Sequence, residues 1–229
     1  VSVTLPQSIA LALQNNRSLH QSQWDYEAAV AQVGVARSGK NPAVTYQYNA
    51  SHTGNETNGI SKTGNAFSHQ LGLGVSLFNR ALDAQIEAAK YSRDGSGAAL
   101  TEAAQTAKLT AATNYLSLIM SRNKVSVAEQ TVRDYEEHFK NANLQYEVGI
   151  VSKSDVLATN TRLANAKTSL VEAKNAASLA EAKFNNHVGL PVSTSIVTAD
   201  KELTYVPYAI SLETAKSYGV AHRGSIVQA

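Results

Sequence analysis

The chain has 229 residues and no cysteine, and its 20 basic and 18 acidic side chains leave a net charge of +2. These numbers exclude a disulfide framework, a zinc–thiolate site and a catalytic thiol, and the balanced charge argues against a dedicated nucleic-acid surface. Alanine supplies much of the 43% hydrophobic content, whereas large core residues are scarce. Such a composition favours long helices packed through small side chains over a thick globular core.

The first 40 residues predict two helices. Pro6 lies in the first turn of a short amphipathic helix over 5–15, and a second helix over 18–38 ends before Pro42. Val1 to Gln7 lack the basic and apolar regions of a signal peptide, which leaves open a cytosolic protein or a mature exported one.

Residues 43–78 change from helical to twofold periodicity, which predicts one β-hairpin. Polar residues occupy the alternate positions, and a Gly- and Asn-rich stretch over 54–64 predicts the connecting loop. Two interpretations remain open: a half-buried hairpin on a helical layer, or a piece of a membrane barrel with its apolar face toward lipid and its polar face toward water. The apolar face consists of Val44, Tyr46, Tyr48, Phe67, Leu71, Leu73, Val75 and Leu77.

Two long helices follow, over 80–145 and 154–188, and each carries a heptad repeat. In the first helix, residues recur every seven positions from Ala104 to Tyr146, with mainly small residues three positions later. The second helix repeats this pattern from Val156 to Phe184. The two patterns predict an antiparallel coiled coil whose helix axes lie close together.

The segment 146–155 predicts a tight turn between these helices, with Gly149 available for a positive φ. Ser152 or Ser154 is a candidate N-cap for the second helix. Asp155 has two interpretations, as compensation of the helix dipole or as a functional carboxylate at the tip.

An internal repeat is visible near the end of the chain. Residues 212–226 can be laid over residues 5–19, with similar residues at the matching apolar positions. We therefore expect 1–207 to form a first repeat and 208–229 to supply the first helix of a second, truncated repeat.

No motif for catalysis, for a metal or for a cofactor is present in the sequence. The six histidines lack metal-ligand spacing, and Gly72-Leu-Gly74 lacks the third glycine of a dinucleotide loop. We expect neither catalytic nor metal-binding nor cofactor-binding residues, and so no enzyme.

The order of several motifs resembles the TolC-type outer-membrane efflux channel family, also called outer membrane factors, over the whole chain. The motifs are Leu5-Pro-x-x-Ile-x-x-Ala-Leu-x-x-Asn-x-x-Leu19, Tyr146-x-Val-Gly-Ile-x-x-x-x-Asp155-Val-Leu and Val188-Gly-Leu-Pro191. The resemblance implies a mainly α fold with long antiparallel coiled-coil helices and one two-stranded β-hairpin, which contributes to an oligomeric membrane β-barrel. Three protomers of two repeats each would form the barrel and a periplasmic helical tunnel.

The resemblance also implies roles for the helical turn. Val148, Gly149 and Ile150 would contact a periplasmic adaptor protein. Ser154 and Asp155 would lie at the periplasmic entrance, where polar links keep the channel closed. The protein would lie in the outer membrane and periplasm of a Gram-negative bacterium.

The leading hypothesis is a passive exit channel of a tripartite efflux pump or a type I secretion system, for drugs or exported proteins. Its partners would be two further copies in a homotrimer, the adaptor, an inner-membrane transporter and membrane lipid, with no nucleic acid. One alternative is an α-helical pore-forming toxin with a β-hairpin tongue, although such a tongue is usually continuously apolar. The other is a soluble coiled-coil scaffold, which would not need an apolar strand face.

Overall fold

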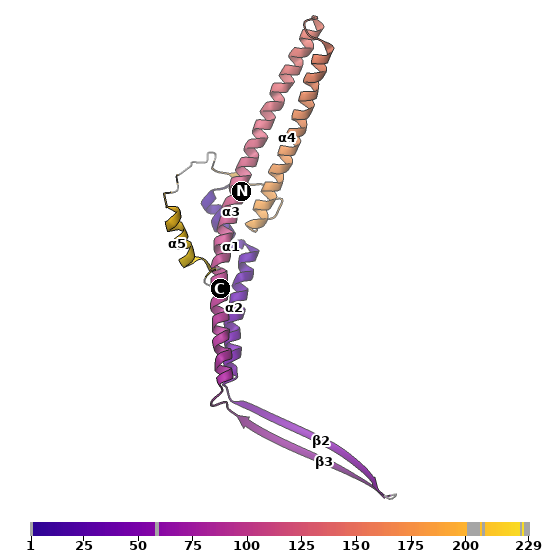
Figure 1. Ribbon diagram of the computed structural model, residues 1–229. Coiled ribbons are helices and arrows are strands. Elements are labelled where there is room, and N and C mark those ends of the chain that lie inside the picture. Colours follow the sequence, from indigo (N-terminus) through magenta and orange to yellow (C-terminus); the bar gives the residue numbers. More distant parts are fainter. Residues whose placement is uncertain (1, 58–59, 201–206, 208, 225, 227–229) are drawn as a thin grey trace. The chain divides into compact units, whose positions relative to one another are not determined.

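The computed structural model describes residues 2–57, 60–200, 207, 209–224 and 226 (Figure 1). The chain divides into two compact units, one containing Val1–Gln23 and Ala99–Val227 and the other built around Trp24–Ala98. The boundaries between these two units lie inside helices. The boundary that the sequence predicts between the two repeats lies at residue 207 instead. The elements are β1 (Ser2–Val3), α1 (Leu5–Asn15), α2 (Arg17–Ser38), β2 (Ala43–Thr57), β3 (Ile60–Gly74), α3 (Arg80–Glu147), α4 (Lys153–His187), β4 (Val197–Thr198) and α5 (Leu212–His222).

Side-chain caps fix the ends of α1 and α2. The Thr4 side chain accepts a hydrogen bond from the Gln7 amide, and the Gln7 side chain accepts one from the Thr4 amide. This capping box satisfies two amide groups that the first turn of a helix leaves unpaired. Asn16 caps α2, since its Oδ1 accepts from the Leu19 amide at 3.0 Å. The second helix therefore begins at Arg17, one residue before the predicted start.

The main core of the first unit lies where α1, α3 and the end of α4 meet. The rings of Tyr115 and Phe184 lie 6.0 Å apart at its centre, and neither side chain is accessible to solvent. Gly189 ends α4 with a φ of +75°, and an added Cβ there would lie 2.7 Å from the carbonyl oxygen of Asn15. The buried members of this core are Val3, Ala12, Ala111, Tyr115, Leu118, Ile119, Phe184, Val188 and Ile196.

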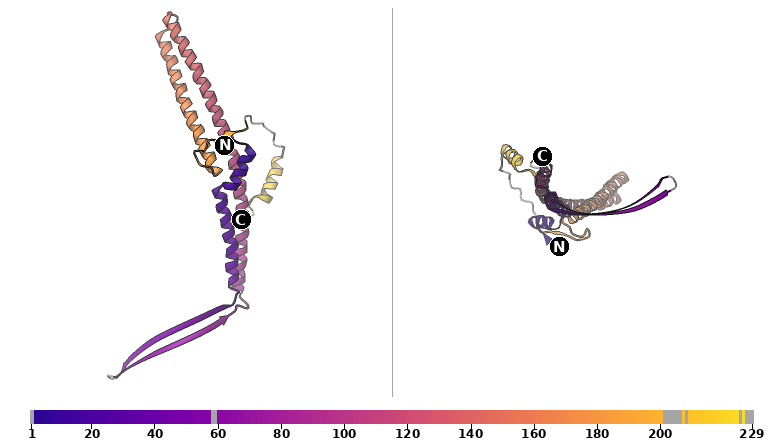
Figure 2. Two further views of the ribbon diagram at one scale, coloured as in Figure 1. Left: turned by 180° about the vertical axis from the view of Figure 1, so that it is seen from behind. Right: turned by 90° about the horizontal axis from the view of Figure 1, so that it is seen from below.

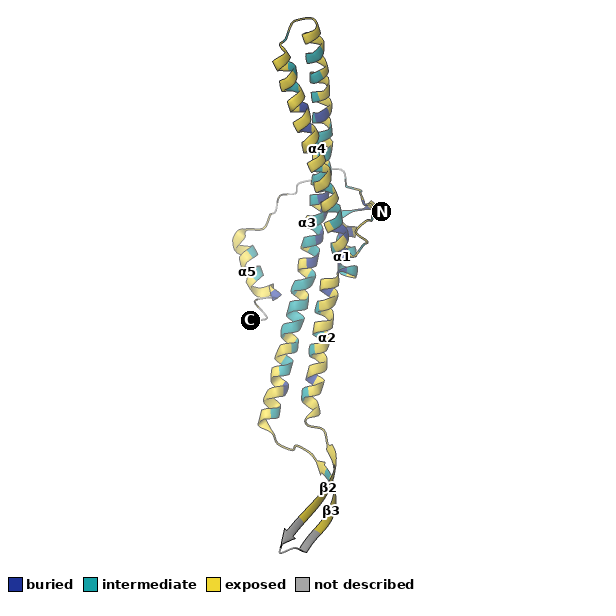
Figure 3. Ribbon diagram, turned by 90° about the vertical axis from the view of Figure 1, so that its right-hand side faces the viewer, coloured by how far each residue is buried: buried dark blue, intermediate teal, exposed yellow. Residues whose placement is uncertain are grey.

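The α3–α4 pair forms the predicted coiled coil. Val132 of α3 is buried against Leu163 and Ala166 of α4, and buried and intermediate positions form a stripe along both helices (Figure 3). These are heptad positions, so the small residue Ala166 allows the helices to approach closely.

Three ion pairs cross the α3–α4 pair at regular intervals. They join Glu136 to Lys167 at 3.0 Å, Glu129 to Lys174 at 3.2 Å, and Arg122 to Glu181 at 3.0 Å. Each step of seven residues back along α3 is matched by a step of seven forward along α4, which is the register of an antiparallel pair. We call these six residues the ionic ladder.

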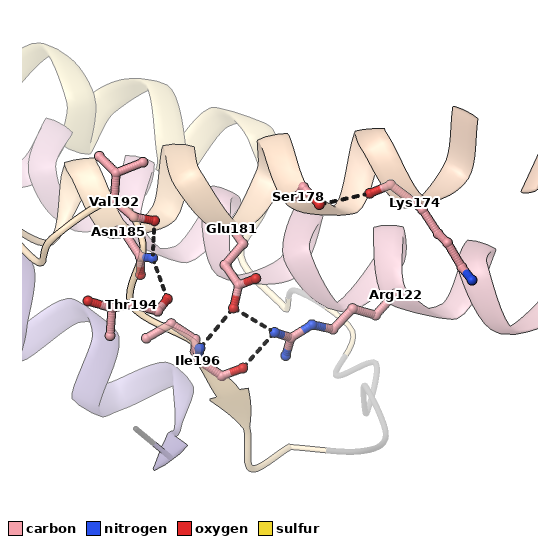
Figure 4. A network of polar contacts seen from close by, with 8 residues as sticks. All are labelled: Arg122, Lys174, Ser178, Glu181, Asn185, Val192, Thr194 and Ile196. Atoms are coloured by element: carbon pink, nitrogen blue, oxygen red, sulfur yellow. Dashed lines mark hydrogen bonds and ion pairs between the residues drawn. The ribbon is translucent and has the colours of Figure 1, made fainter. Parts of the chain in front are cut away.

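The segment after α4 is held by polar contacts to α3 and α4 (Figure 4). Arg122 Nη2 donates to Glu181 Oε1 and, at 2.5 Å, to the Ile196 carbonyl, while the Ile196 amide donates to Glu181 Oε1 at 2.8 Å. Buried Asn185 Nδ2 donates to the carbonyls of Val192 and Thr194 at 3.1 and 2.7 Å. These bonds fix the stretch between α4 and β4, which contains no helix or strand of its own.

The same segment closes back on the start of the chain. β4 pairs in parallel with β1, and Asp200 Oδ2 accepts from the Leu5 amide at 3.0 Å and from the Tyr115 hydroxyl at 2.7 Å. Burial, together with the hydrogen bond to Asp200, raises the pKa of Tyr115. The carboxylate at the start of α1 also complements the helix dipole.

The β-hairpin is a long antiparallel pair whose register runs from Ala43 opposite Gly74 to Thr57 opposite Ile60 (Figure 2). β3 ends at Gly74, whereas the sequence predicts a hairpin that continues to residue 78. Val75 and Leu77, expected on the strand, therefore lie in the connection to α3.

The last described helix, α5, buries none of its side chains. Ser211 caps it by accepting from the Thr214 amide at 3.2 Å. None of the helices in the described part of the chain combines the length and the apolarity that a membrane crossing requires.

Candidate functional site

The turn between α3 and α4 exposes two apolar side chains at the end of a helical hairpin. Gly149 has a φ of +79°, and the Ile150 amide donates to the Gln145 carbonyl at 2.8 Å. This is the bond of a Schellman motif, in which glycine takes the left-handed conformation. Val148 is 71% and Ile150 72% exposed. The backbone is thus fixed while both side chains remain free to contact a partner.

Ser152 and Asp155 form a capping box at the start of α4. Asp155 Oδ2 accepts from the Ser152 amide at 3.0 Å and from the Ser152 hydroxyl at 2.7 Å, and Ser152 Oγ lies 3.3 Å from the Asp155 amide. The hydrogen bonds from Ser152 lower the pKa of Asp155. Of the two candidate caps, Ser152 is the one used, and Ser154 lies exposed in the first turn. Asp155 therefore has a local structural role in this chain.

One face of the β-hairpin, which we call the outward face, carries the apolar residues that the sequence singled out, except Val75 and Leu77, which follow β3. The register places Val44 opposite Leu73 and Tyr46 opposite Leu71, so these four share one face. They are 65 to 76% exposed, since no described part of the chain covers them. His69, opposite Tyr48, lies on this face as well.

The opposite face of the hairpin is polar. Gln47 lies opposite Gln70, and Asn49 lies opposite Ser68. Thr45 faces Gly72, where an added Cβ would lie 2.7 Å from Thr45 Oγ1. The two faces therefore suit two different surroundings, one apolar and one aqueous.

A groove of about 950 Å³ along α3 and α4 was not predicted from the sequence. Its apolar wall includes Leu116, Met120 and Val127, which are 38 to 66% exposed. These residues form a second apolar stripe on α3, beside the one that packs on α4. The signal was present in the sequence, because a helix with two apolar stripes has two partners. The groove is lined by Thr113, Leu116, Ser117, Met120, Asn123, Lys124, Val127, Ala128, Thr131, Tyr135, Arg162, Asn165, Ala166 and Ser169.

In the part of the chain that the structure describes, no three His, Asp or Glu side chains are grouped so that they could hold a metal ion.

Comparison with known protein families matches residues 8–190 to the family described as outer membrane efflux protein. The chain belongs to the outer membrane efflux protein family. The match covers most of α1, the β-hairpin and all of α2, α3 and α4, and so includes both exposed apolar regions. The resemblance inferred from the sequence motifs is confirmed.

Solved structures show that the chain has the fold of this family. It superposes with a TM-score of 0.80 on a membrane protein from Pseudomonas aeruginosa, at 20% identity, over 98% of this chain and 54% of that one. The outer membrane channel CmeC of Campylobacter jejuni gives 0.71 at 17% identity, over 90% of this chain and 45% of that one. The open state of the channel MtrE of Neisseria gonorrhoeae gives 0.73 at 19% identity, over 98% and 50%.

The chain thus spans about half the length of the structures that it resembles. Among curated proteins, none matches its sequence. The predicted fold class, long antiparallel helices with one β-hairpin, is confirmed for this efflux-family chain.

Proposed function

We propose that the chain is about half of a protomer of an outer-membrane exit channel. The channel is a passive conduit for drugs or exported proteins in a tripartite efflux pump or a type I secretion system. The observation that carries the proposal is the exposed, two-faced β-hairpin in a chain of the outer membrane efflux protein family. Its apolar face fits lipid, and its polar face fits a water-filled lumen.

The two-repeat organisation of the protomer is supported by α5. When residue 212 is laid over residue 5, the two helices begin and end at matching positions, and Thr4 and Ser211 are matching N-caps. α1 buries Ser8 and Ala12, whereas α5 buries nothing. We propose that α5 opens a second repeat whose remaining helices would cover it.

Assembly as a homotrimer is part of the same proposal, and the exposed surfaces support association with further strands and helices. Two strands have unpaired edges, and closing them into a barrel requires strands from a second repeat and from further copies. The groove along α3 is a surface for an additional helix of the assembled tunnel. The channel would lie in the outer membrane of a Gram-negative bacterium and extend into the periplasm.

The helical turn is proposed as the periplasmic end of the channel. Val148, Gly149 and Ile150 would contact the periplasmic adaptor, because an exposed apolar pair on a fixed turn is a compact docking point. An inner-membrane transporter would then deliver the substrate. Ser154 and Asp155 would lie at the entrance, where the Asp155 carboxylate favours cations.

The entrance assignment is tested by separating the charge of Asp155 from its capping role. Asp155→Asn removes the charge in the full-length channel, whereas Ser152→Ala removes the cap and keeps the charge. In planar lipid bilayers, we expect Asp155→Asn to reduce cation selectivity and Ser152→Ala to preserve it. Equal selectivity in wild type and Asp155→Asn would refute the entrance role. Absence of any conductance from the wild-type channel would refute the exit-channel function itself.

A further inference from the structure

The outward face of the β-hairpin changes its chemistry from the base toward the loop. Nearest the base, the directly opposed pairs are Val44 with Leu73 and Tyr46 with Leu71. Next come Tyr48 with His69 and Ala50 with Phe67, a layer that we call the aromatic layer. The following pair is His52 with Asn65, in which His52 Nδ1 donates to Asn65 Oδ1 at 2.6 Å. The aliphatic residues Val44, Leu71 and Leu73 therefore lie nearest the base, rings lie from Tyr46 to Phe67, and the polar pair lies nearest the loop.

Side chains in and beside the aromatic layer contact one another. The Tyr48 ring lies 4.9 Å from the His69 ring and 6.4 Å from the Phe67 ring, centroid to centroid. The Tyr46 hydroxyl is hydrogen-bonded to His69 Nδ1 at 2.7 Å. Rings with an apolar body and a polar tip are typical of the level at which hydrocarbon meets water. A protein partner would not require this ordered change along the strands.

The apolar stretch of β3 covers most of the depth of a bilayer. On this strand, outward positions alternate from Phe67 to Leu73, and Val75 and Leu77, which follow β3, are exposed as well. The residues from Phe67 to Gly74, at about 3.3 Å per step and tilted by about 40°, rise about 18 Å, compared with about 25 Å for the apolar band of outer-membrane barrels. Beyond the base, Lys40 forms an ion pair with Asp83. Charged groups thus begin where the apolar stretch ends.

The strands are longer than this band. β2 and β3 each have 15 residues, whereas about 9 to 11 suffice to cross a bilayer. The surplus lies on the loop side of the aromatic layer, in 52–57 and 60–65.

We infer that the outer boundary of the hydrocarbon crosses the hairpin at the aromatic layer, and that the paired strands continue beyond it into water. The inference rests on the proposed function and specifies the lipid contact of the same surface. Under this assignment, Leu71 and Leu73 lie in hydrocarbon, Phe67 and His69 lie at the boundary, and Asn65 lies outside.

Single-cysteine spin labels in the full-length protein, reconstituted in phosphatidylethanolamine–phosphatidylglycerol vesicles, test this boundary. This half of the protein contributes no competing cysteine. Labels on Leu73→Cys and Leu71→Cys should be reached by oxygen more than by a water-soluble nickel chelate. The preference should reverse between Phe67→Cys and Asn65→Cys. Ser68→Cys and Gln70→Cys, on the opposite face at the same depth, are matched controls and should be reached by the chelate.

The possible outcomes distinguish failure of the proposed hydrocarbon boundary from failure of the proposed channel function. An oxygen preference that persists at Asn65→Cys and Thr63→Cys would overturn the boundary and leave membrane insertion standing. Chelate access at Leu71→Cys and Leu73→Cys in folded protein would overturn both. If Phe67→Cys or Asn65→Cys fails to assemble, Ala50→Cys and His52→Cys report the same two levels, because they lie directly opposite.

Discussion

The chain contains two hairpins, one of helices and one of strands, and they differ in whether the chain itself buries their apolar residues. The α3–α4 hairpin packs Val132 against Leu163 and Ala166, and the ionic ladder fixes its register. In the β-hairpin, every residue whose exposure is described is exposed except Gly72, which is intermediate. A helical pair forms a seam from its own two members, whereas a two-stranded ribbon has two faces and cannot cover either. The first hairpin is therefore specified internally, and the second depends on its surroundings.

The same substitution in the two hairpins gives the sharpest test of this difference. Leu163→Ala, at a residue 7% exposed, should lower the free energy of unfolding of the chain in water by roughly 2–5 kcal/mol. Leu73→Ala, at a residue 75% exposed, should change it by less than about 0.5 kcal/mol. Urea unfolding followed by helical circular dichroism measures both. Equal losses would show that the β-hairpin is packed within the chain.

The apolar face of the β-hairpin, which matters little for unfolding in water, should matter strongly for membrane insertion. Leu73→Lys places an ammonium group on the apolar face, at a cost of roughly 2–4 kcal/mol near the bilayer centre. Gln70→Lys, on the polar face, is the matched control and should insert normally. Flotation of the full-length protein with vesicles gives the inserted fraction, and helical circular dichroism should be unchanged in both variants. Equal insertion of the two variants would contradict the two-faced hairpin.

Loss of the cap at the tip of the helical hairpin should have a smaller effect. Ser152→Ala removes the hydroxyl that bonds Asp155, and N-cap removal typically costs about 1 kcal/mol. We expect a decrease of this size in the free energy of unfolding, and no decrease for Ser154→Ala, whose side chain is not the cap.

The same cap predicts a pH dependence. Because the pKa of Asp155 is lowered on folding, its stabilisation is complete above the ordinary value of 3.8 and is lost as the pH falls through the lowered value. The difference between wild type and Ser152→Ala should therefore narrow in acid. A constant difference across this range would show that the carboxylate does not take part.

The smallest effect is expected in the ionic ladder. A double-mutant cycle of Glu129→Gln and Lys174→Gln should give a coupling of about 0.2–1 kcal/mol, because both side chains are largely exposed. The coupling should weaken at high salt. Glu172→Gln, an exposed carboxylate of α4 outside the ladder, should show no coupling to Lys174. A coupling as large as the loss at Leu163 would mean that the ladder, and not the seam, specifies the pair.

Much of the fold was predictable because its signals are local. The twofold alternation around Tyr46 and Leu71 predicted a hairpin with one apolar face, and the heptads predicted the seam at Val132 and Leu163. The end of β3 was predicted less well. Val75 and Leu77 continue the alternation after the pairing has ended, so periodicity alone could not mark Gly74 as the last strand residue.

The sequence singled out the residues of the candidate site, whereas their contacts needed the structure. The turn and Asp155 stood out in the sequence, whereas the choice of Ser152 over Ser154 as the cap depends on backbone geometry that neither residue type reveals. The groove beside Met120 was missed, since its apolar stripe is interrupted by Lys124 and becomes a surface only when α4 lies alongside.

The sequence by itself determined the helices, the two faces of the β-hairpin and the family, because periodicity and motif order are properties of neighbouring residues. Only the tertiary structure decided that Asp200 binds Leu5 and Tyr115, that Arg122 holds Ile196, and that the ladder pairs α3 with α4 in one register. Such contacts join residues far apart in the chain. They form only where packing brings a donor within about 3 Å of its acceptor, and no local pattern encodes that distance.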